Sequence, residues 1–352
     1  MLNFFYLYYL KDRSKNILKF IVFTVVIVAL MYLAFRDVNF DELLVQLKKA
    51  NYLLALLASL IGVLIGGWIR AYRWKFFLEP VKDRIRFRNL FSSMMIGYMM
   101  NSVVPKSGEV SRPVVLAKQE DISRAAAFGT IIAERIFDMI SLFVSFGFCL
   151  FYFRDSIFDA FGNDFEQYAL YGSIVVFTGV VIIVVMILNF QRTEYFIEKY
   201  LTGFLPDKIK PKVKEILVSL INGFLFIKYP KNYFIIFFLS VMLWLSYVLS
   251  TYVMFFAFGI DLNFLDANLL LTIITFTLVL PLPGNSAGAF HVVCTTVLVS
   301  IYSINKELAL SYATVSHLLN FVLLVAIGFY YSVKENIQIN LKYEKVETNS
   351  SN

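Results

Sequence analysis

The chain has 352 residues, of which 59% are hydrophobic and 16% are charged, and its formal net charge is +7. Soluble chains carry about 25% charged residues, so this composition excludes an ordinary soluble domain and predicts an integral membrane protein built from α-helices. In such a protein the positions of the basic residues, more than their total, indicate which helix ends face the cytoplasm.

Several apolar runs reach the roughly 20 residues that a helix needs to cross a bilayer. The first run is long and lacks a small-residue cleavage site, so we expect a membrane span there and no secretory signal peptide. We expect one membrane domain over residues 1–335 and a polar, disordered cytoplasmic tail over residues 336–352. The predicted full spans are Ile17–Phe35, Tyr52–Ile69, Ala126–Phe153, Ala169–Phe190, Tyr233–Phe258 and Leu308–Tyr331.

The charge of the loops orients these spans. Lysine and arginine are concentrated before the first span, in Arg70–Arg88 and in the loop before the fifth span, whereas the loop after the third span is acidic. Positively charged loops stay on the cytoplasmic side, so both termini are expected in the cytoplasm. The predicted location is the cell membrane.

Two further apolar segments are interrupted in a way that lipid does not tolerate. Asn89–Pro105 ends in a polar turn, and Ala267–Asn305 is broken midway by Pro281–Gly288. Proline removes a backbone donor and glycine loosens a helix, and lipid cannot satisfy the freed N–H and C=O groups. Because loop charge places both ends of each segment on one side, we predict two re-entrant helical hairpins of opposite orientation.

The order of these elements repeats in the two halves of the chain, about residues 1–155 and 156–335. Each half consists of a span, a span, a hairpin and a span, and the halves start on opposite sides of the membrane. This order is typical of the inverted-topology repeat of transporters, whose substrate sites lie at paired breaks. The predicted fold is therefore an all-α membrane protein with about six full spans and two re-entrant hairpins, whose tips approach each other near the bilayer centre.

Three ionisable residues interrupt the third span: Glu134, Arg135 and Asp138. Ten residues of helix from Arg124 rise about 15 Å, which places this group near the midplane, where an unpaired charge costs roughly 2.5–3.5 kcal/mol. Arg135 and Asp138 are i,i+3 neighbours and can pair. Two interpretations follow: the pair braces the bundle, or Arg135 faces a polar cavity that receives an anionic head group.

Basic residues near the first break also have two interpretations. Lys106 and Arg112 could hold a phosphate at the cytoplasmic mouth, or they belong to an ordinary positively charged loop. The segment Trp68–Trp74, which includes Arg70 and Arg73, is interpreted as an interfacial belt, with a lipid head-group contact as the alternative.

The two histidines, His291 and His317, are interpreted first as interhelical hydrogen-bonding groups. His291 follows the second break, so proton coupling or a head-group contact is the alternative there. The histidines and the two cysteines, which lie in apolar runs, have no neighbours that predict a metal site or a disulfide. We expect no cofactor, no catalytic residue and no nucleic-acid partner.

Four motifs, taken in order, resemble one known family. Arg70–Trp74 resembles its Arg-x-x-Arg-Trp signature, Asn101–Arg112 its N…P…x-G-E-x-x-R loop, Ser123–Asp138 its S…A…E-R-x-x-D helix, and Pro283–Gly288 its P-x-P-G-G-x-G-x-x-E turn. The family is the transmembrane, flippase-like domain of lysylphosphatidylglycerol synthases, which includes stand-alone members without the synthase. The resemblance covers about residues 15–335.

This resemblance implies movement of a phospholipid or a lipid-linked head group between leaflets. His291 stands where the family often has a glutamate, so a carboxylate role at this position is not implied. The chain also has no room after its last span for the soluble aminoacyl-transferase domain, so we do not expect it to aminoacylate lipids.

We therefore predict a carrier, not an enzyme, that flips an anionic phospholipid or lipid-linked head group. The alternatives are an intramembrane enzyme or accessory factor of lipid-linked glycan or phospholipid metabolism, and a non-transporting membrane scaffold. Expected partners are the lipid substrate, the bilayer, and either a second copy of the chain or a cytoplasmic lipid-modifying enzyme. The candidate lipid-binding residues are Arg70, Arg73, Lys106, Glu109, Arg112, Glu134, Arg135, Asp138, Asn285 and His291.

Overall fold

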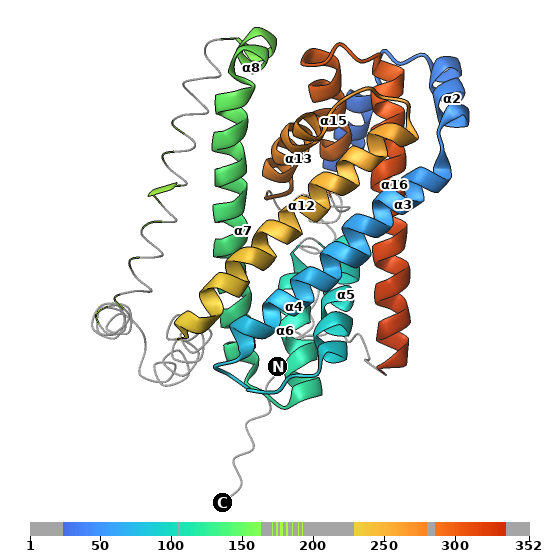
Figure 1. The fold of residues 1–352 in the computed structure, drawn as a ribbon. Coiled ribbons are helices and arrows are strands. Elements are labelled where there is room, and N and C mark those ends of the chain that lie inside the picture. The colour runs from blue at the N-terminus through green and yellow to red at the C-terminus, as the bar shows by residue number, and fades with distance from the viewer. Residues whose placement is uncertain are drawn as a thin grey trace, which may run out of the picture.

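The computed structural model of this chain describes residues 24–104, 106–162, 229–279 and 286–335, with scattered positions between 171 and 192. In these parts of the chain every regular element is a helix (Figure 1). This confirms the predicted all-α class. The predicted fourth span is described only at scattered positions, and the tail and Asn285 lie outside the described residues.

Within the described residues, four helices are long and apolar enough to cross a membrane, and each corresponds to one of the six predicted spans. They have 25 to 29 residues, a length of about 38–44 Å at 1.5 Å per residue, which exceeds the ~30 Å hydrocarbon core. Thr24–Phe35 is the described part of the predicted first span. The four helices are Tyr52–Leu78, α7 (Arg124–Tyr152), α12 (Tyr233–Ala257) and α16 (Lys306–Lys334). The first of them consists of α3 (Tyr52–Leu60), the π-helical turn η1 (Ile61–Ile65) and α4 (Gly66–Leu78).

Asparagine and serine side chains determine where several helices begin. Asn39 accepts hydrogen bonds from two backbone N–H groups at the start of α2 (Phe40–Lys49). Asn51, Ser123 and Asn305 cap α3, α7 and α16 in the same way. Such caps satisfy donors that the first helical turn leaves free, so the starts of these helices follow directly from the sequence.

The first predicted break is a sharp turn between two helices that pack along each other, α5 (Phe87–Val103) and α6 (Ser107–Glu120). The chain reverses at Lys106, whose φ of 59° lies in the left-handed region. The backbone N–H of Gly108 donates to Asn101 Oδ1 at 2.6 Å, which satisfies a free donor in the first turn of α6. The break therefore forms the tip of a helical hairpin.

The second arm of this hairpin is longer than the sequence analysis expects. Lys106 and Arg112 are expected in a loop beyond the hairpin, whereas in the structure the arm runs from Ser107 to Glu120 and includes Arg112. At the base of the arm, the Glu120 carboxylate accepts hydrogen bonds from Lys82, Asn89 and the backbone of Arg86. Burial raises the pKa of Glu120, but these hydrogen bonds outweigh burial and keep its pKa below the ordinary value.

The second predicted break separates α13 (Phe264–Val279) from α15 (Ala289–Ser300). Gly288, just before α15, has a φ of 82°, which glycine adopts without steric cost. A Cβ at Gly288 would lie 2.6 Å from Leu30 Cβ, so glycine also lets the first apolar helix approach the break. Figure 1 shows α5 and α6 beside one end of α16, and α13 and α15 beside its other end; α5 and α15 both contact α16.

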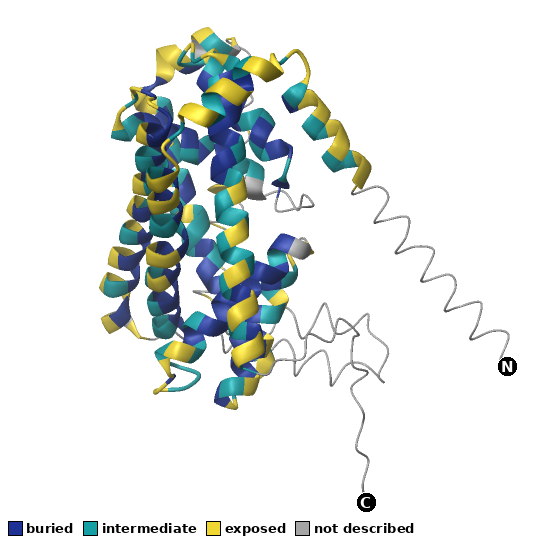
Figure 2. Ribbon diagram, turned by 90° about the vertical axis from the view of Figure 1, so that its right-hand side faces the viewer, coloured by how far each residue is buried: buried dark blue, intermediate teal, exposed yellow. Residues whose placement is uncertain are grey.

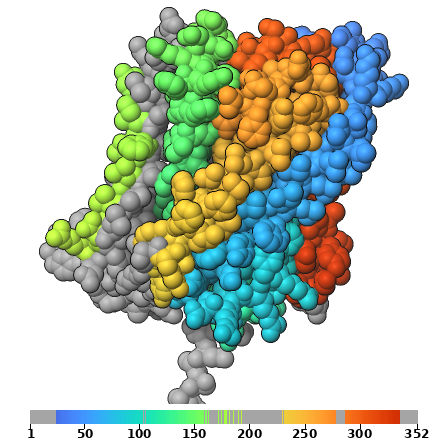
Figure 3. Space-filling view, in the orientation of Figure 1, coloured from blue at the N-terminus to red at the C-terminus, as the bar shows by residue number. Residues whose placement is uncertain are grey.

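Large apolar side chains cover the outside of this bundle. Phe151 on α7 is 87% exposed and Phe234 on α12 is 77% exposed, and Figure 2 shows exposed residues along the outward faces of the long helices. In Figure 3, α12 and the α3–α4 helix run side by side across the molecule and cover the helices behind them. A surface of exposed apolar side chains suits contact with lipid. Together with the four long apolar helices, it shows that this is a multi-pass membrane protein. Of the short helices, α8 (Arg154–Phe161) directly follows α7, and η5 (Pro230–Asn232) directly precedes α12.

The contact between the two arms of the first hairpin makes a test possible. Gly108→Ala should destabilise the protein by about 1–3 kcal/mol, the usual cost of overpacking, because the new Cβ would collide with the carbonyl oxygen of Gly97 and the side chain of Asn101. The matched control is Gly147→Ala on α7, where an added Cβ meets nothing within 4 Å. Unfolding midpoints in one detergent give the comparison, and equal midpoints for the two variants would contradict the tight α5–α6 contact.

Candidate functional site

One face of α4 points polar side chains into the bundle. Arg70, Arg73 and Trp74 are spaced i, i+3 and i+4, which aligns them on the helix, and they are 8%, 1% and 0% exposed. Trp68 is 51% exposed and stacks on Tyr72, as an interfacial belt requires. Arg73 and Trp74 lie inside the bundle, so the predicted belt does not include them.

Glu134 on α7 is completely buried and forms a two-point ion pair with α6. Arg112 Nη1 lies 3.2 Å from Oε1 of Glu134, and Arg112 Nη2 lies 2.9 Å from its Oε2, the forked geometry that makes guanidinium–carboxylate pairs strong and specific. The Arg112 guanidinium also lies 3.8 Å from the centroid of the Trp74 ring, and the Trp74 indole donates to Thr130 of α7 at 2.8 Å. Helices α4, α6 and α7 therefore meet at one ion pair.

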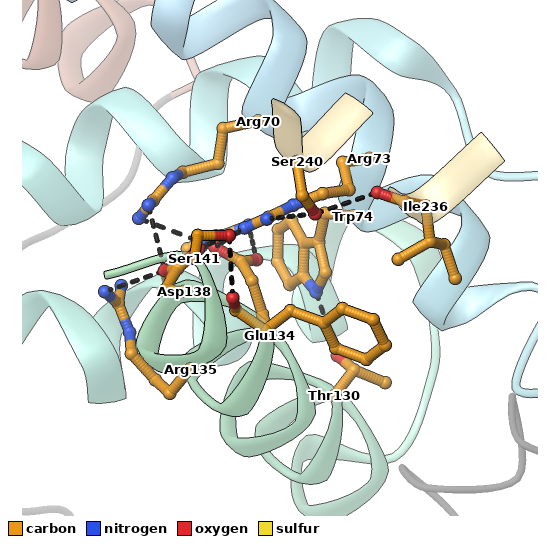
Figure 4. A network of polar contacts seen from close by, with 12 residues as sticks. Arg70, Arg73, Trp74, Thr130, Glu134, Arg135, Asp138, Ser141, Ile236 and Ser240 are labelled. Carbon is orange, nitrogen blue, oxygen red and sulfur yellow. Dashed lines mark hydrogen bonds and ion pairs between the residues drawn. The ribbon is translucent and has the colours of Figure 1, made fainter. Parts of the chain in front are cut away.

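One turn further along α7, Asp138 accepts from three arginines (Figure 4). Arg70 Nη2 lies 2.9 Å from Asp138 Oδ2, and Arg73 donates to Asp138 Oδ1. Arg135 Nη1 is 3.3 Å from Asp138 Oδ2, which confirms the predicted i,i+3 pair as one contact of a larger network. Arg73 also donates to Ser240 of α12 at 2.8 Å, so the network reaches a fourth helix.

A looser group of ion pairs extends from Arg135 to the tip of the first hairpin. Glu109 Oε1 lies 3.6 Å from Arg135 Nε and 3.8 Å from Lys106 Nζ, both beyond hydrogen-bond distance. The side chains of Lys106, Glu109 and Arg135 are 43%, 30% and 37% exposed. We call these three residues the outer edge, and we call Arg70, Arg73, Arg112, Glu134 and Asp138 the inner part of the network.

The network contains more basic than acidic groups. Five cations against three carboxylates leave a formal excess of +2. Charges at membrane depth are costly unless they are paired or hydrated. Guanidinium forks match the geometry of phosphate as well as carboxylate, so the arrangement is suited to receive an anion. The cations are Arg70, Arg73, Lys106, Arg112 and Arg135, and the carboxylates are Glu109, Glu134 and Asp138.

The structure brings together eight of the ten candidate residues. Asn285 lies outside the described residues, and His291 is elsewhere, at the start of α15. The Nδ1 atom of His291 accepts from the backbone N–H of Gly288 at 3.4 Å, and its ring centroid lies 5.3 Å from that of His317. The hydrogen bond lies within the start of its own helix, and the contact with His317 on α16 is between rings, so an interhelical hydrogen bond of His291 stays a prediction.

Two members of the network were not identified as such from the sequence. Ser240 is a polar residue in an otherwise apolar span, and polar residues in spans usually face the bundle interior, so this signal was present. Trp74 follows Arg70 by four residues, which places both on one helix face. That spacing could have indicated that Trp74 is buried with Arg70, whereas the guanidinium over its ring comes from Arg112 on another helix.

A second polar cluster, without charged groups, joins α7 to α13. Ser145 of α7 donates to Asn268 Oδ1 of α13 at 3.0 Å, and Trp244 of α12 donates to the same oxygen at 2.9 Å. Ser145 also lies 2.8 Å from the hydroxyl of Thr272. Within the described residues, no group of three histidine, cysteine, aspartate or glutamate side chains is arranged to hold a metal ion.

The Arg112–Glu134 pair predicts an asymmetric mutational response. Arg112→Leu should destabilise the protein by about 3–5 kcal/mol, because it leaves the buried Glu134 carboxylate short of its main partner. The double change Arg112→Leu and Glu134→Leu should recover much of this loss, since Asp138 still pairs with Arg70 and Arg73. Lys118→Gln, an exposed position on the same helix, is the control for thermal unfolding in detergent. A double variant as unstable as Arg112→Leu alone would refute the pair as the cause.

The model of the lysylphosphatidylglycerol synthase TM region matches residues 16–328 of this chain. The chain is 23% identical over 329 residues to a UPF0104 membrane protein of Methanocaldococcus jannaschii, covering 91% of this chain and 94% of that protein. It is 25% identical over 302 residues to a UPF0104 membrane protein of Pyrococcus horikoshii, covering 78% and 84% of the two chains. No solved structure matches the chain. Because the matched segment spans most of the chain and contains the whole charged network, the chain belongs to the lysylphosphatidylglycerol synthase TM region family.

Proposed function

We propose that this protein is a membrane carrier that moves an anionic phospholipid or lipid-linked head group between leaflets. The observation that carries this proposal is the excess of +2 in a charged network built on helices of membrane-crossing length. A purely structural brace needs equal numbers of opposite charges, whereas a site for an anion needs surplus donors. The family takes its name from enzymes of a phosphodiester lipid, and that chemistry agrees with the surplus of arginine.

The proposal includes a topology of six spans and two re-entrant hairpins of opposite orientation, in the cell membrane, with both termini in the cytoplasm. Two helix–break–helix units support it, one beside each end of α16 (Figure 1). Irregular backbone at membrane depth must be shielded by protein or water, and Gly288, at the described end of the second break, lies against Leu30 of the first apolar helix. An inverted repeat accounts for one such unit in each half.

The two interpretations of Arg135 and Asp138 apply to different parts of the network. Asp138 belongs to the inner part and forms ion pairs with Arg70 and Arg73 as well as with Arg135. Replacing Arg135 and Asp138 together would therefore disturb folding, and the variant would not isolate a transport role. Arg135 and Lys106 are the accessible cations. The proposed lipid path therefore passes the outer edge.

The carrier proposal also agrees with the state of the two carboxylates of the inner part. An intramembrane enzyme that uses Glu134 and Asp138 as acid and base requires one of them free to exchange a proton. Both are surrounded by guanidinium groups that stabilise the ionised form. This arrangement favours a binding role for the network over a proton-transfer role.

Transport can be tested in vesicles that contain the full-length protein and phosphatidylglycerol labelled with a fluorophore on one acyl chain. Dithionite should bleach the inner-leaflet label faster than in protein-free vesicles, because the protein exposes that lipid to the outer leaflet. Arg135→Gln should slow this step by roughly tenfold, as expected for the loss of about 1.4 kcal/mol of interaction. Lys118→Gln should leave the rate unchanged. Folded protein that does not accelerate bleaching of this lipid would support the scaffold alternative.

The topology can be tested by cysteine labelling in intact cells. Cysteines introduced at Asp159 and Asp261, both exposed, should react with an impermeant maleimide from outside. A cysteine at Lys231, whose side chain is 65% exposed, should react only after permeabilisation. The native cysteines Cys149 and Cys294 are buried and give a low background. Labelling of the Lys231 variant in intact cells would overturn the proposed orientation.

A further inference from the structure

The ion pairs of the network differ in tightness, and this difference suggests two roles. In the inner part, each carboxylate has a contact of 2.9 Å, Arg112–Glu134 and Arg70–Asp138, with arginine side chains that are at most 9% exposed; Arg70 and Arg73 also lie 3.5 and 3.6 Å from Glu134. At the outer edge the distances are 3.6 and 3.8 Å, and each side chain is at least 30% exposed. Short, buried pairs hold helices together, whereas long, accessible pairs can be exchanged for a ligand at low cost.

One oxygen atom marks the position where such an exchange can occur. Glu109 Oε1 is the carboxylate atom that faces both Lys106 Nζ and Arg135 Nε. Arg135 Nε is buried and makes no hydrogen bond within the described residues. Glu109 belongs to the first turn of α6, and its carboxylate lies beyond hydrogen-bond distance of both cations. A ligand oxygen that is not tethered to α6 can approach both donors more closely.

We infer that Glu109 is a built-in competitor for the lipid head group, and that its carboxylate occupies the position between Lys106 and Arg135 that a phosphate oxygen takes. The inference rests on the proposed function for the ligand being a lipid. The inference adds two points to the proposed function. The outer edge is the part of the network that contacts the phosphate, and the Glu109 carboxylate occupies the position of the phosphate oxygen when no lipid is bound.

The charge balance favours a singly charged phosphodiester as the ligand. With Glu109 in place, the outer edge has two cations and one carboxylate. Exchange of the carboxylate for a phosphodiester replaces one negative charge by another and leaves no new uncompensated charge at the edge. The Glu109 side chain is 30% exposed, so it can turn to the accessible side without losing its hydration.

The test measures binding, separately from transport. Full-length protein in a neutral detergent is titrated with dioleoylphosphatidylglycerol, with dioleoylphosphatidylcholine or with inorganic phosphate, and the rise of the unfolding midpoint gives the apparent affinity. Glu109→Gln should tighten phosphatidylglycerol binding on the order of fivefold, because it removes a competing negative charge next to the phosphate. Arg135→Gln and Lys106→Gln should weaken it. Exposed Asp41→Asn and Lys118→Gln are matched charge controls and should match the wild-type protein.

Misfolding lowers affinity and does not raise it, so Glu109→Gln is the decisive variant when its midpoint without lipid equals that of the wild type. If this variant binds phosphatidylglycerol as the wild type does, the inference fails; if it binds more weakly, Glu109 contacts a cationic part of the head group and the inference also fails. The same gain with inorganic phosphate alone would overturn the assignment to a lipid.

The binding result and the vesicle result can fail independently. A gain of affinity without lipid movement in vesicles would refute the carrier proposal and keep the inference. Lipid movement with no difference between Glu109→Gln and Asp41→Asn in binding would refute the inference and keep the carrier proposal.

Discussion

The buried carboxylate of Glu134 has no access to solvent, and guanidinium groups from two other segments of the chain neutralise it. Arg112 comes from the second arm of the first hairpin, and Arg70 and Arg73 come from α4. Removing one partner of a buried pair costs about 3–5 kcal/mol, so the three segments keep their relative positions. The outer edge, Asp138 and the contact with α12 are all arranged around this fixed point.

Much of the fold could be predicted because its signals are local. Asparagine and serine caps mark helix starts, and Pro281–Gly288 and the polar turn after Asn101 mark the two breaks. Counting residues along the third span placed Glu134 and Asp138 deep in the bundle. The partner of Arg112 could not be predicted, because Glu134 is 22 residues away in the sequence and the contact exists only after α6 has folded back against α7. For the same reason the sequence suggested a loop for Arg112, where the structure has a buried pair.

The π-helical turn η1 illustrates a second limit of sequence analysis. It lies in the middle of an apolar run and has no polar residue or proline to mark it. Such a turn changes the direction in which the following side chains point, and here it precedes the face that carries Arg70 and Arg73. The spacing of these arginines was visible in the sequence, but the side of the bundle to which they point depends on the register after η1. This explains why a segment that resembles an interfacial belt contributes two arginines to the interior.

The helices α6 and α13, one beside each break, are held to α7 by polar interactions of different strength. Separating α6 from α7 would leave the buried Arg112 without its ion-pair partner and Glu134 with only its longer contacts to Arg70 and Arg73, at a cost of up to about 3–5 kcal/mol. Separating α13 from α7 would break neutral hydrogen bonds of Ser145 with Asn268 and Thr272, each worth about 0.5–1.5 kcal/mol. Counted on these polar contacts, α13 is held to α7 by weaker interactions than α6 is, and the ring contacts of Phe143 and Phe146 with Phe276 add to the α13–α7 packing. For the proposed carrier, the ion pair between α6 and α7 holds Lys106 and Arg135, the two cations of the outer edge, next to each other where a head group would bind.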